Sequence, residues 1–459
     1  MKKITAQNRA EMLLEAPLGP VITRLAVPTI ISMLITAIYN MADTYFVSQI
    51  DTEATAAVGV VFSAMALIQA VAFTIGMGSG SNMSRALGAG KEKEAKTLVS
   101  VGFFTAFFVG VVITMLGNLN LEAVVRFLGA TDEIAPHARA YARYIFYAAP
   151  FMICSFVMNN LLRFQGLAGY AMVGITTGGI LNMILDPILI FGMGLGTAGA
   201  AIATGISQIV SFTILLLMCN LQTSTISVSW RNFKPSAAMY ARIFYTGMPS
   251  LGRQGIASVA TILLNRVAGG ISTDPATVSA AIAAMSIVNR FVLFINSTVI
   301  GFGQGFQPVC AFCWGAGKRE RVRKAFFLCV KVATLILLVL SGISLVLSEP
   351  IIRVFRADDP LVVAIGTKAL RLQLLTLPLW GFYVMSNMCT QSIGYGMQAL
   401  IISSARQGIF LIPTVLILPK LLGILGLQLA QPCADVLAFI LSIVIMRGAL
   451  AKMKDSDAQ

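Results

Sequence analysis

Runs of about 20 apolar residues recur along the whole of this 459-residue chain, and each is long enough to cross a bilayer as a helix. Isolated strands are excluded because lipid cannot satisfy the hydrogen bonds of their open edges. The sequence therefore predicts about twelve transmembrane helices. Their approximate spans are 21–50, 55–86, 97–117, 141–163, 170–192, 197–221, 241–269, 278–312, 325–347, 361–394, 398–419 and 425–448.

Composition supports this assignment. Hydrophobic residues make up 57% of the chain and charged residues only 11%, whereas soluble domains carry roughly 25% charged residues. A water-soluble fold could not hide so much apolar surface. The predicted fold class is an all-α integral membrane protein.

The formal net charge is +14, from 33 Lys and Arg against 19 Asp and Glu. The basic residues gather at alternate helix ends, in residues 2–9, 85–96, 231–242, 318–324 and 447–454. Cytoplasmic loops of membrane proteins show this bias. The charge therefore indicates orientation and no nucleic-acid partner. We predict a multi-pass protein of the cytoplasmic (inner) membrane with both termini in the cytoplasm.

The two halves of the chain repeat each other. The segment GMGSG from Gly76 corresponds to GFGQG from Gly301, and GAGK from Gly88 corresponds to GAGK from Gly315. Further matches follow in the same order: Asn159 with Asn387, Gly166 with Gly394, and Gly196 with Gly423. The repeat predicts six-helix lobes at 1–221 and 241–459, joined by a cytoplasmic linker at 222–240. Six helices per lobe give parallel lobes related by a pseudo-twofold axis along the membrane normal.

Several motifs that suggest other chemistry fail on inspection. The glycine segments lie inside predicted membrane helices, so close helix packing explains them better than phosphate binding. The lysines of GAGK are followed by Glu92 and Arg319, which excludes a P-loop. The single histidine and the scattered cysteines form no catalytic or metal-binding set. We predict no enzymatic activity, no cofactor and no structural metal.

Two aspartates inside apolar runs are the strongest functional signal. Counting from the outer helix ends places Asp43, Asp186 and Thr204 each roughly 10 Å below the outer surface. Asn182 precedes Asp186 by one helical turn and so shares its face. An intramembrane aspartate can simply bond to a neighbouring helix, but such residues are functional by default. We predict a cation-coupling site formed by Asp43, Asn182, Asp186 and Thr204.

The chemistry of this site follows from burial. A bare carboxylate in a poorly solvated pocket is costly, and two neighbouring carboxylates titrate as a coupled unit. Protons could therefore bind from one side of the membrane and leave on the other. Sodium is the rival coupling ion, and it would use the same four side chains. Pro187 lacks an N–H and leaves the carbonyl of Met183 as a further oxygen ligand.

A third intramembrane acid, Asp435, lies in the last predicted helix. It either contributes to substrate binding or pairs with Arg253 or Arg406, and we favour the pairing. Methionines and aromatic residues suit varied ligands, and polar groups would line the same cavity. The further candidates for a substrate cavity are Tyr39, Asn40, Asn159, Asn160, Gln165 and Met285.

Several segments resemble a known transporter family. They are NMADTYFV from Asn40, NMILDP from Asn182, GTAGAAIATGISQ from Gly196, GMPSLGRQGIASVATILLNR from Gly247 and AAIAAMSIVNRFVLFINSTVIGFGQGFQPV from Ala280. The chain resembles the multidrug and toxic compound extrusion (MATE) transporters, especially their bacterial MepA-like branch.

The resemblance implies a twelve-helix antiporter that exchanges protons or sodium for bulky, often cationic compounds. It also implies that Asp43, Asn182, Asp186 and Thr204 form the cation site of the N-terminal lobe. Some members carry an acid on the seventh helix, where this chain has Arg253 and Gln254. A sodium site in the second lobe is therefore not expected.

We predict an ion-coupled multidrug efflux antiporter that works by alternating access. Its partners would be membrane lipid and small amphipathic drug-like substrates, and it would act as a monomer. The alternative is a flippase or exporter of lipid-linked or other amphipathic metabolites. That function would require cationic residues lining the cleft to hold phosphates, whereas the N-terminal lobe offers acids.

Overall fold

The computed structural model describes residues 6–221, 227–269, 275–355 and 359–455. Within these ranges the chain is almost wholly helical and contains no strand. It divides into two compact units. Unit 1 comprises Met1–Leu251, Gln304–Lys318 and Ser392–Gly394, and unit 2 comprises Gly252–Gly303, Arg319–Gln391 and Tyr395–Gln459.

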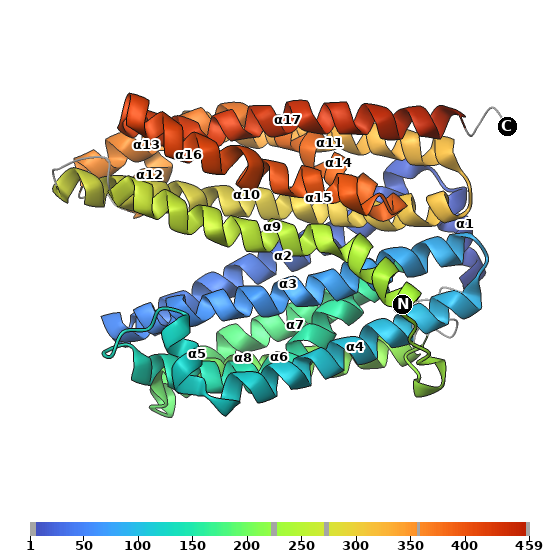
Figure 1. Ribbon diagram of the computed structural model, residues 1–459, viewed down its shortest axis with the longest axis horizontal. Coiled ribbons are helices and arrows are strands. Elements are labelled where there is room, and N and C mark those ends of the chain that lie inside the picture. The colour runs from blue at the N-terminus through green and yellow to red at the C-terminus, as the bar shows by residue number, and fades with distance from the viewer. Residues whose placement is uncertain (1–5, 222–226, 270–274, 356–358, 456–459) are drawn as a thin grey trace. The chain divides into compact units, whose positions relative to one another are not determined.

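Unit 1 is a helical bundle built around α6, which packs against α3, α4, α7 and α8 (Figure 1). Its helices are α1 (Ala6–Leu14), α2 (Leu18–Ser48), α3 (Thr52–Gly88), α4 (Glu92–Leu119), α5 (Leu121–Phe127), α6 (Ala135–Phe164), α7 (Ala168–Pro187), the π-helix η1 (Ile188–Gly192) and α8 (Gly196–Leu221). The 3₁₀ turn η2 (Trp230–Asn232) follows. The unit also takes the beginning of α9 (Ala237–Gly269) and the end of α10 (Pro275–Gly315).

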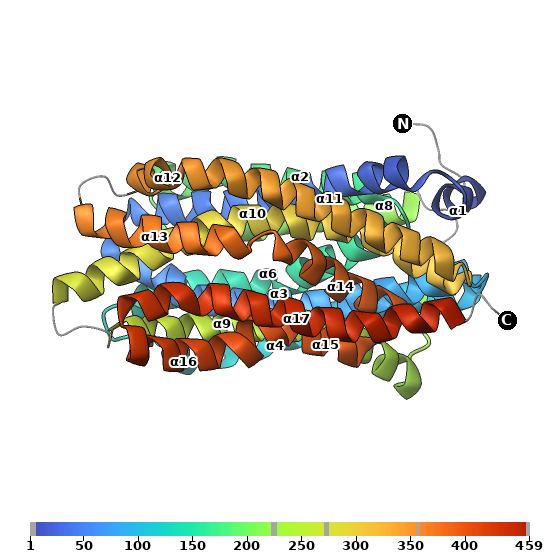
Figure 2. The same ribbon diagram turned by 90° about the horizontal axis from the view of Figure 1, so that it is seen from above.

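Unit 2 contains the remainder of α9 and α10. Its other helices are α11 (Arg319–Val346), α12 (Ser348–Phe355), α13 (Pro360–Thr376), α14 (Leu379–Ile393), α15 (Gly396–Ser404), the π-helix η3 (Ala405–Phe410), α16 (Leu411–Leu422) and α17 (Ile424–Asp455). The last helix, α17, packs against α11, α13, α15, η3 and α16 (Figure 2).

The described part of the chain contains ten helices that are long and apolar enough to cross a membrane. The pair α13 and α14 forms an eleventh span, which is bent by 57°. Pro378 lies at the break, where its missing N–H interrupts the helical hydrogen bonds. The twelfth predicted span corresponds to α9, whose 33 residues also suffice to cross a bilayer. The prediction of an all-helical membrane protein is confirmed.

The internal repeat is visible in local geometry. Asn159 donates a hydrogen bond to the carbonyl of Ala171 at 3.0 Å, and Asn387 donates to the carbonyl of Ala399 at 2.7 Å. Each asparagine thereby joins the two arms of a helical hairpin. Left-handed glycines also recur in aligned pairs: Gly90 with Gly317, Gly166 with Gly394, and Gly196 with Gly423. The turns between helices therefore share one design in both halves.

The glycine segments of α3 allow backbones to touch. A Cβ atom on Gly78 would overlap the carbonyl oxygen of Ile243 in α9. A Cβ on Gly247 of α9 would in turn overlap the carbonyl of Thr74 in α3. The predicted packing role of these segments is thus what the structure shows for α3 and α9.

Candidate functional site

Asp43 of α2 is buried, with 9% of its surface exposed. The hydroxyl of Tyr141 in α6 donates a hydrogen bond to its Oδ2 at 3.2 Å. Tyr39, one turn earlier in α2, lies within electrostatic reach of the same carboxylate. The other oxygen, Oδ1, has no hydrogen-bond partner within the described part of the chain. Half of this carboxylate is thus left available to a cation or a proton.

Asn182 joins the other two predicted residues. Its Nδ2 lies 3.2 Å from Oδ1 of Asp186 and 3.3 Å from Oγ1 of Thr204. Asp186 is fully buried, and it lies within electrostatic reach of Asp43. The packing of α7 against both α2 and α8 brings the three helices together. The structure therefore gathers all four predicted side chains in unit 1.

Three buried oxygens of this cluster have no hydrogen-bond partner in the described part of the chain. They are Oδ1 of Asp43, Oδ1 of Asn182 and Oδ2 of Asp186. A cavity of about 10 Å³, lined by Tyr39, Asn182 and Thr204 among others, lies beside them. That volume is about the room needed by one water molecule. Asn182, which carries one of the unpaired acceptors, lines this space, and the volume suits a proton, a single water or a small cation.

The local fold supports this arrangement through Pro187. Helix α7 ends at this proline, and the chain continues as the π-helix Ile188–Gly192. A proline removes one helical hydrogen bond, and π-helical turns often occur at functional sites. The irregular backbone begins directly after Asp186, so it lies at the cluster itself.

The other cavity candidates occupy different places. Asn159 donates to the carbonyl of Ala171 and so joins α6 to α7, whereas Asn160 donates to the carbonyl of Phe156 within α6. Gln165 is buried near the end of α6, and Met285 is buried in unit 2. Asn40 is partly buried in α2. Among these candidates only Tyr39 lines the small cavity beside Asn182.

Asp435 is paired with Arg406, as the favoured alternative predicted. The Nε of Arg406 lies 2.7 Å from Oδ1 of Asp435. Gln431 donates to the same oxygen at 2.8 Å, and Thr376 donates to Oδ2 at 3.2 Å. Both carboxylate oxygens of Asp435 are therefore occupied, in contrast to those of Asp43 and Asp186.

Sequence reasoning missed Tyr141. Nothing in its surroundings distinguishes it from the other nine tyrosines of the chain. Its partner, Asp43, is 98 positions away, so only tertiary packing reveals the contact. Trp380, which stacks on Arg406, was missed for the same reason.

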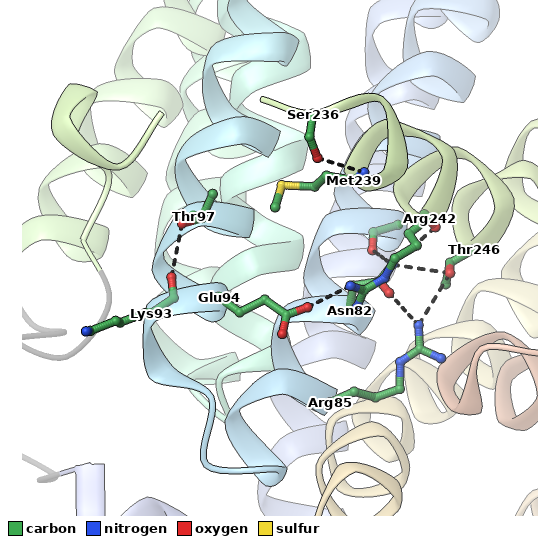
Figure 3. Close-up of polar contacts among 10 residues, drawn as sticks. Asn82, Arg85, Lys93, Glu94, Thr97, Ser236, Met239, Arg242 and Thr246 are labelled. Carbon is green, nitrogen blue, oxygen red and sulfur yellow. Dashed lines mark hydrogen bonds and ion pairs between the residues drawn. The ribbon is translucent and has the colours of Figure 1, made fainter. Parts of the chain in front are cut away.

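A second polar cluster lies where α9 enters unit 1 (Figure 3). Asn82 of α3 donates to Oγ1 of Thr246 at 3.2 Å, and Arg85 donates to Oδ1 of Asn82 at 2.6 Å. Nearby, Arg242 of α9 forms a 2.7 Å ion pair with Glu94 of α4. These contacts fix the first turns of α9 to both α3 and α4. The sequence had marked Arg85 and Arg242 only as loop charges.

The known proteins to which this chain is similar are transporters. The multidrug export protein MepA of Staphylococcus saprophyticus is 26% identical over 422 residues, which cover 92% of each chain. The FAD transporter of Shewanella oneidensis is 25% identical over 429 residues, 93% of each chain.

Solved structures agree. An outward-facing multidrug resistance MATE family transporter of the MOP superfamily superposes with a TM-score of 0.91 and 26% identity, covering 99% of both chains. A MOP superfamily transporter from Pyrococcus furiosus, described as having a binding pocket of reversed polarity, gives a TM-score of 0.90 and 26% identity. That match covers 97% of this chain and 98% of the other.

The MatE family model matches residues 28–188 and 249–417, which is most of the chain. These two segments fall on the two repeated halves, and the first contains Asp43, Asn182 and Asp186. On this match the chain belongs to the MatE family of multidrug and toxic compound extrusion transporters.

Proposed function

We propose that this protein is an ion-coupled exporter of amphipathic compounds, driven by protons or sodium ions that bind at Asp43, Asn182, Asp186 and Thr204. The observation that carries the proposal is the set of orphaned oxygens on Asp43, Asn182 and Asp186, buried in unit 1. An unpaired buried carboxylate is costly in a membrane protein unless a cation or a proton neutralises it.

Alternating access supplies the coupling. When Asp43 and Asp186 are open to one side of the membrane they bind the ion, and when they are open to the other side they release it. Because a neutralised site is less costly to bury, ion binding and conformational change depend on each other. The whole ion site comes from one chain, so the proposal takes the monomer as the transporting unit.

The proposal places the protein in the cytoplasmic membrane with both termini in the cytoplasm, on the strength of the basic segments at alternate helix ends. Relatives named as multidrug exporters support a substrate class of small drug-like compounds. The relative named as an FAD transporter supports a second candidate, the export of an amphipathic metabolite. The guanidinium of Arg406 in unit 2 favours this candidate, because it suits an anionic or planar substrate better than a cation.

The test uses purified protein in liposomes that contain ethidium, with pH and sodium gradients imposed separately. We expect efflux driven by one of the two gradients, and we expect Asp43→Asn and Asp186→Asn each to abolish it. Asp132→Asn is the matched control, since Asp132 is an exposed aspartate that lies in the turn between α5 and α6 and pairs with Arg126 of α5. Full activity in both Asp43→Asn and Asp186→Asn would reject the ion site.

A further inference from the structure

Unit 2 contains a polar cavity that the ion site does not use. Its volume is about 240 Å³, and residues from α9, α10, α13, α14, η3, α16 and α17 line it. Five carboxamides, from Asn289, Asn296, Gln373, Gln407 and Gln431, surround it together with Arg406 and Trp380. So many amides around one space are unusual inside an apolar helical bundle.

Most of these amides have no partner among the described residues. Gln373 is only 4% exposed, yet its side chain makes no hydrogen bond within the part of the chain that the structure describes. The side chains of Asn296 and Gln407, which are partly buried, and of Asn289, which is exposed, make no hydrogen bond there either. Burying an amide without a partner is unfavourable, because the amide gives up its hydrogen bonds to water. A ligand that both donates and accepts hydrogen bonds would remove that cost.

Arg406 and Trp380 give the cavity a flat, rigid wall. The guanidinium carbon of Arg406 lies 3.6 Å from the centroid of the Trp380 ring. The Nε of Arg406 is held by Asp435 at 2.7 Å. Its two terminal nitrogens make no hydrogen bond among the described residues. A fixed guanidinium plane stacks on flat rings and binds carboxylate or phosphate oxygens in pairs.

The charges around the cavity disfavour a cationic ligand. Arg253 and Arg406 both lie within electrostatic reach of Tyr383. Arg253 also precedes Ala257, a lining residue, by one helical turn. The one intramembrane acid of the region, Asp435, already accepts three hydrogen bonds. Unit 1 has the opposite character, with Asp43 and Asp186 and no guanidinium beside them among the described contacts.

The backbone at Arg406 is irregular as well. Residues Ala405–Phe410 form a π-helix, as Ile188–Gly192 do after Asp186 in unit 1. In unit 1 the widened turn begins two residues after Asp186, and in unit 2 it contains Arg406, which lines the cavity. π-Helical turns often occur at functional sites, so the two cavities share a structural device while differing in charge.

We propose that the cavity of unit 2 binds planar heteroaromatic compounds that are neutral or anionic, stacked on Arg406 and hydrogen-bonded by the surrounding amides. This site would serve a second class of substrates, distinct from amphipathic cations. The inference rests on the proposed export function for its biological meaning, but binding can be measured without transport.

The first experiment measures binding by equilibrium dialysis of the purified full-length protein. The probes are riboflavin, which is planar and neutral, flavin mononucleotide, which adds a phosphate, and ethidium, which is planar and cationic. We expect both flavins to bind saturably, flavin mononucleotide at least as tightly as riboflavin, and excess ethidium to leave them bound. Displacement of both flavins by ethidium, or no saturable flavin binding, would overturn the inference.

Gln373→Leu and Asn296→Leu identify the site, because leucine keeps the volume and removes the amide. Each should weaken flavin binding at least tenfold. The control is Asn118→Leu, whose amide bonds the carbonyl of Thr114 within α4 and lines neither cavity. Equal flavin affinity in Gln373→Leu, Asn296→Leu and Asn118→Leu would contradict the assignment.

A spectroscopic measurement places the ligand. The chain has three tryptophans, so Trp230→Phe combined with Trp314→Phe leaves Trp380 as the sole emitter. Bound flavin should quench that emission with the affinity found by dialysis. If the double variant does not fold, equilibrium dialysis of the native chain and of the leucine variants decides whether the cavity binds flavin. Intact ethidium efflux without flavin binding would contradict the flavin site and leave the proposed transport mechanism standing. Flavin binding without ion-driven efflux would contradict only the transport mechanism.

Discussion

The hydroxyl of Tyr141 donates a hydrogen bond to Oδ2 of Asp43 across 3.2 Å and so joins α6 to α2. Helix α6 is the central helix of unit 1, and Tyr141 is fully buried in it. The tyrosine thereby holds one oxygen of Asp43 in place, while the other has no partner among the described residues. The proposed ion site needs both features, a fixed carboxylate and a free oxygen.

Tyr141→Phe should impair ion-driven efflux without unfolding the protein. A hydrogen bond to a charged group contributes about 1.5–3 kcal/mol, so we expect efflux in proteoliposomes to fall about tenfold or more. Tyr147→Phe is the control, because Tyr147 belongs to the same helix but is 55% exposed. Equal efflux in the two variants would show that the Tyr141 hydroxyl has no part in the ion site.

Gly78→Ala should destabilise unit 1. The new methyl group would overlap the carbonyl oxygen of Ile243, and forcing atoms into a close-packed site costs about 1–3 kcal/mol. Gly59→Ala, in the same helix, meets no atom within 4 Å and should be neutral or stabilising by up to about 1 kcal/mol. Thermal unfolding in detergent measures both. A Gly78→Ala protein as stable as Gly59→Ala would contradict the close contact of α3 with α9.

The polar cluster of Figure 3 predicts unequal effects of two substitutions in α9. Thr246→Val removes the oxygen that Asn82 and Arg85 share in a buried position, which should cost about 1–3 kcal/mol. Arg242→Gln breaks the ion pair with Glu94, but Arg242 has a side chain that is 53% exposed, and such pairs contribute at most about 1 kcal/mol. Thermal unfolding of the two variants tests the order, and the reverse order would be evidence against the cluster.

Asp435→Leu should be strongly destabilising. It leaves the guanidinium of Arg406 buried without its carboxylate, which costs about 3–5 kcal/mol. The double variant Asp435→Leu with Arg406→Met removes both charges and should recover most of the lost stability, measured by thermal unfolding. It should also lose flavin binding. Recovery of stability together with unchanged flavin binding would separate Arg406 from the cavity's ligand.

Much of the fold could be predicted from the sequence, because length and hydropathy act locally. A run of apolar residues long enough for the bilayer must be a helix, so the spans were found nearly complete. The bend at Pro378 was missed because the proline lies within a continuous apolar run. Nor could the sequence show that α9 enters unit 1 through contacts with α3 and α4.

The proposed ion site was also only partly predictable from the sequence. Charged residues inside a membrane are rare and therefore conspicuous, and the regular rise of a helix suffices to predict that Asp43, Asn182, Asp186 and Thr204 lie at one depth. The hydrogen bond from Tyr141, the pairing of Asp435 with Arg406 in preference to Arg253, and the amide-lined cavity of unit 2 came only from the structure.

The sequence by itself determined that this chain is a helical membrane protein with an internal repeat and three acids within its spans. These properties depend on the bilayer, which imposes the same rule on every segment. The tertiary structure decided which oxygens stay unpaired and which side chains share a cavity. Those properties depend on contacts between helices that are distant in sequence, and each contact is set by packing around both partners.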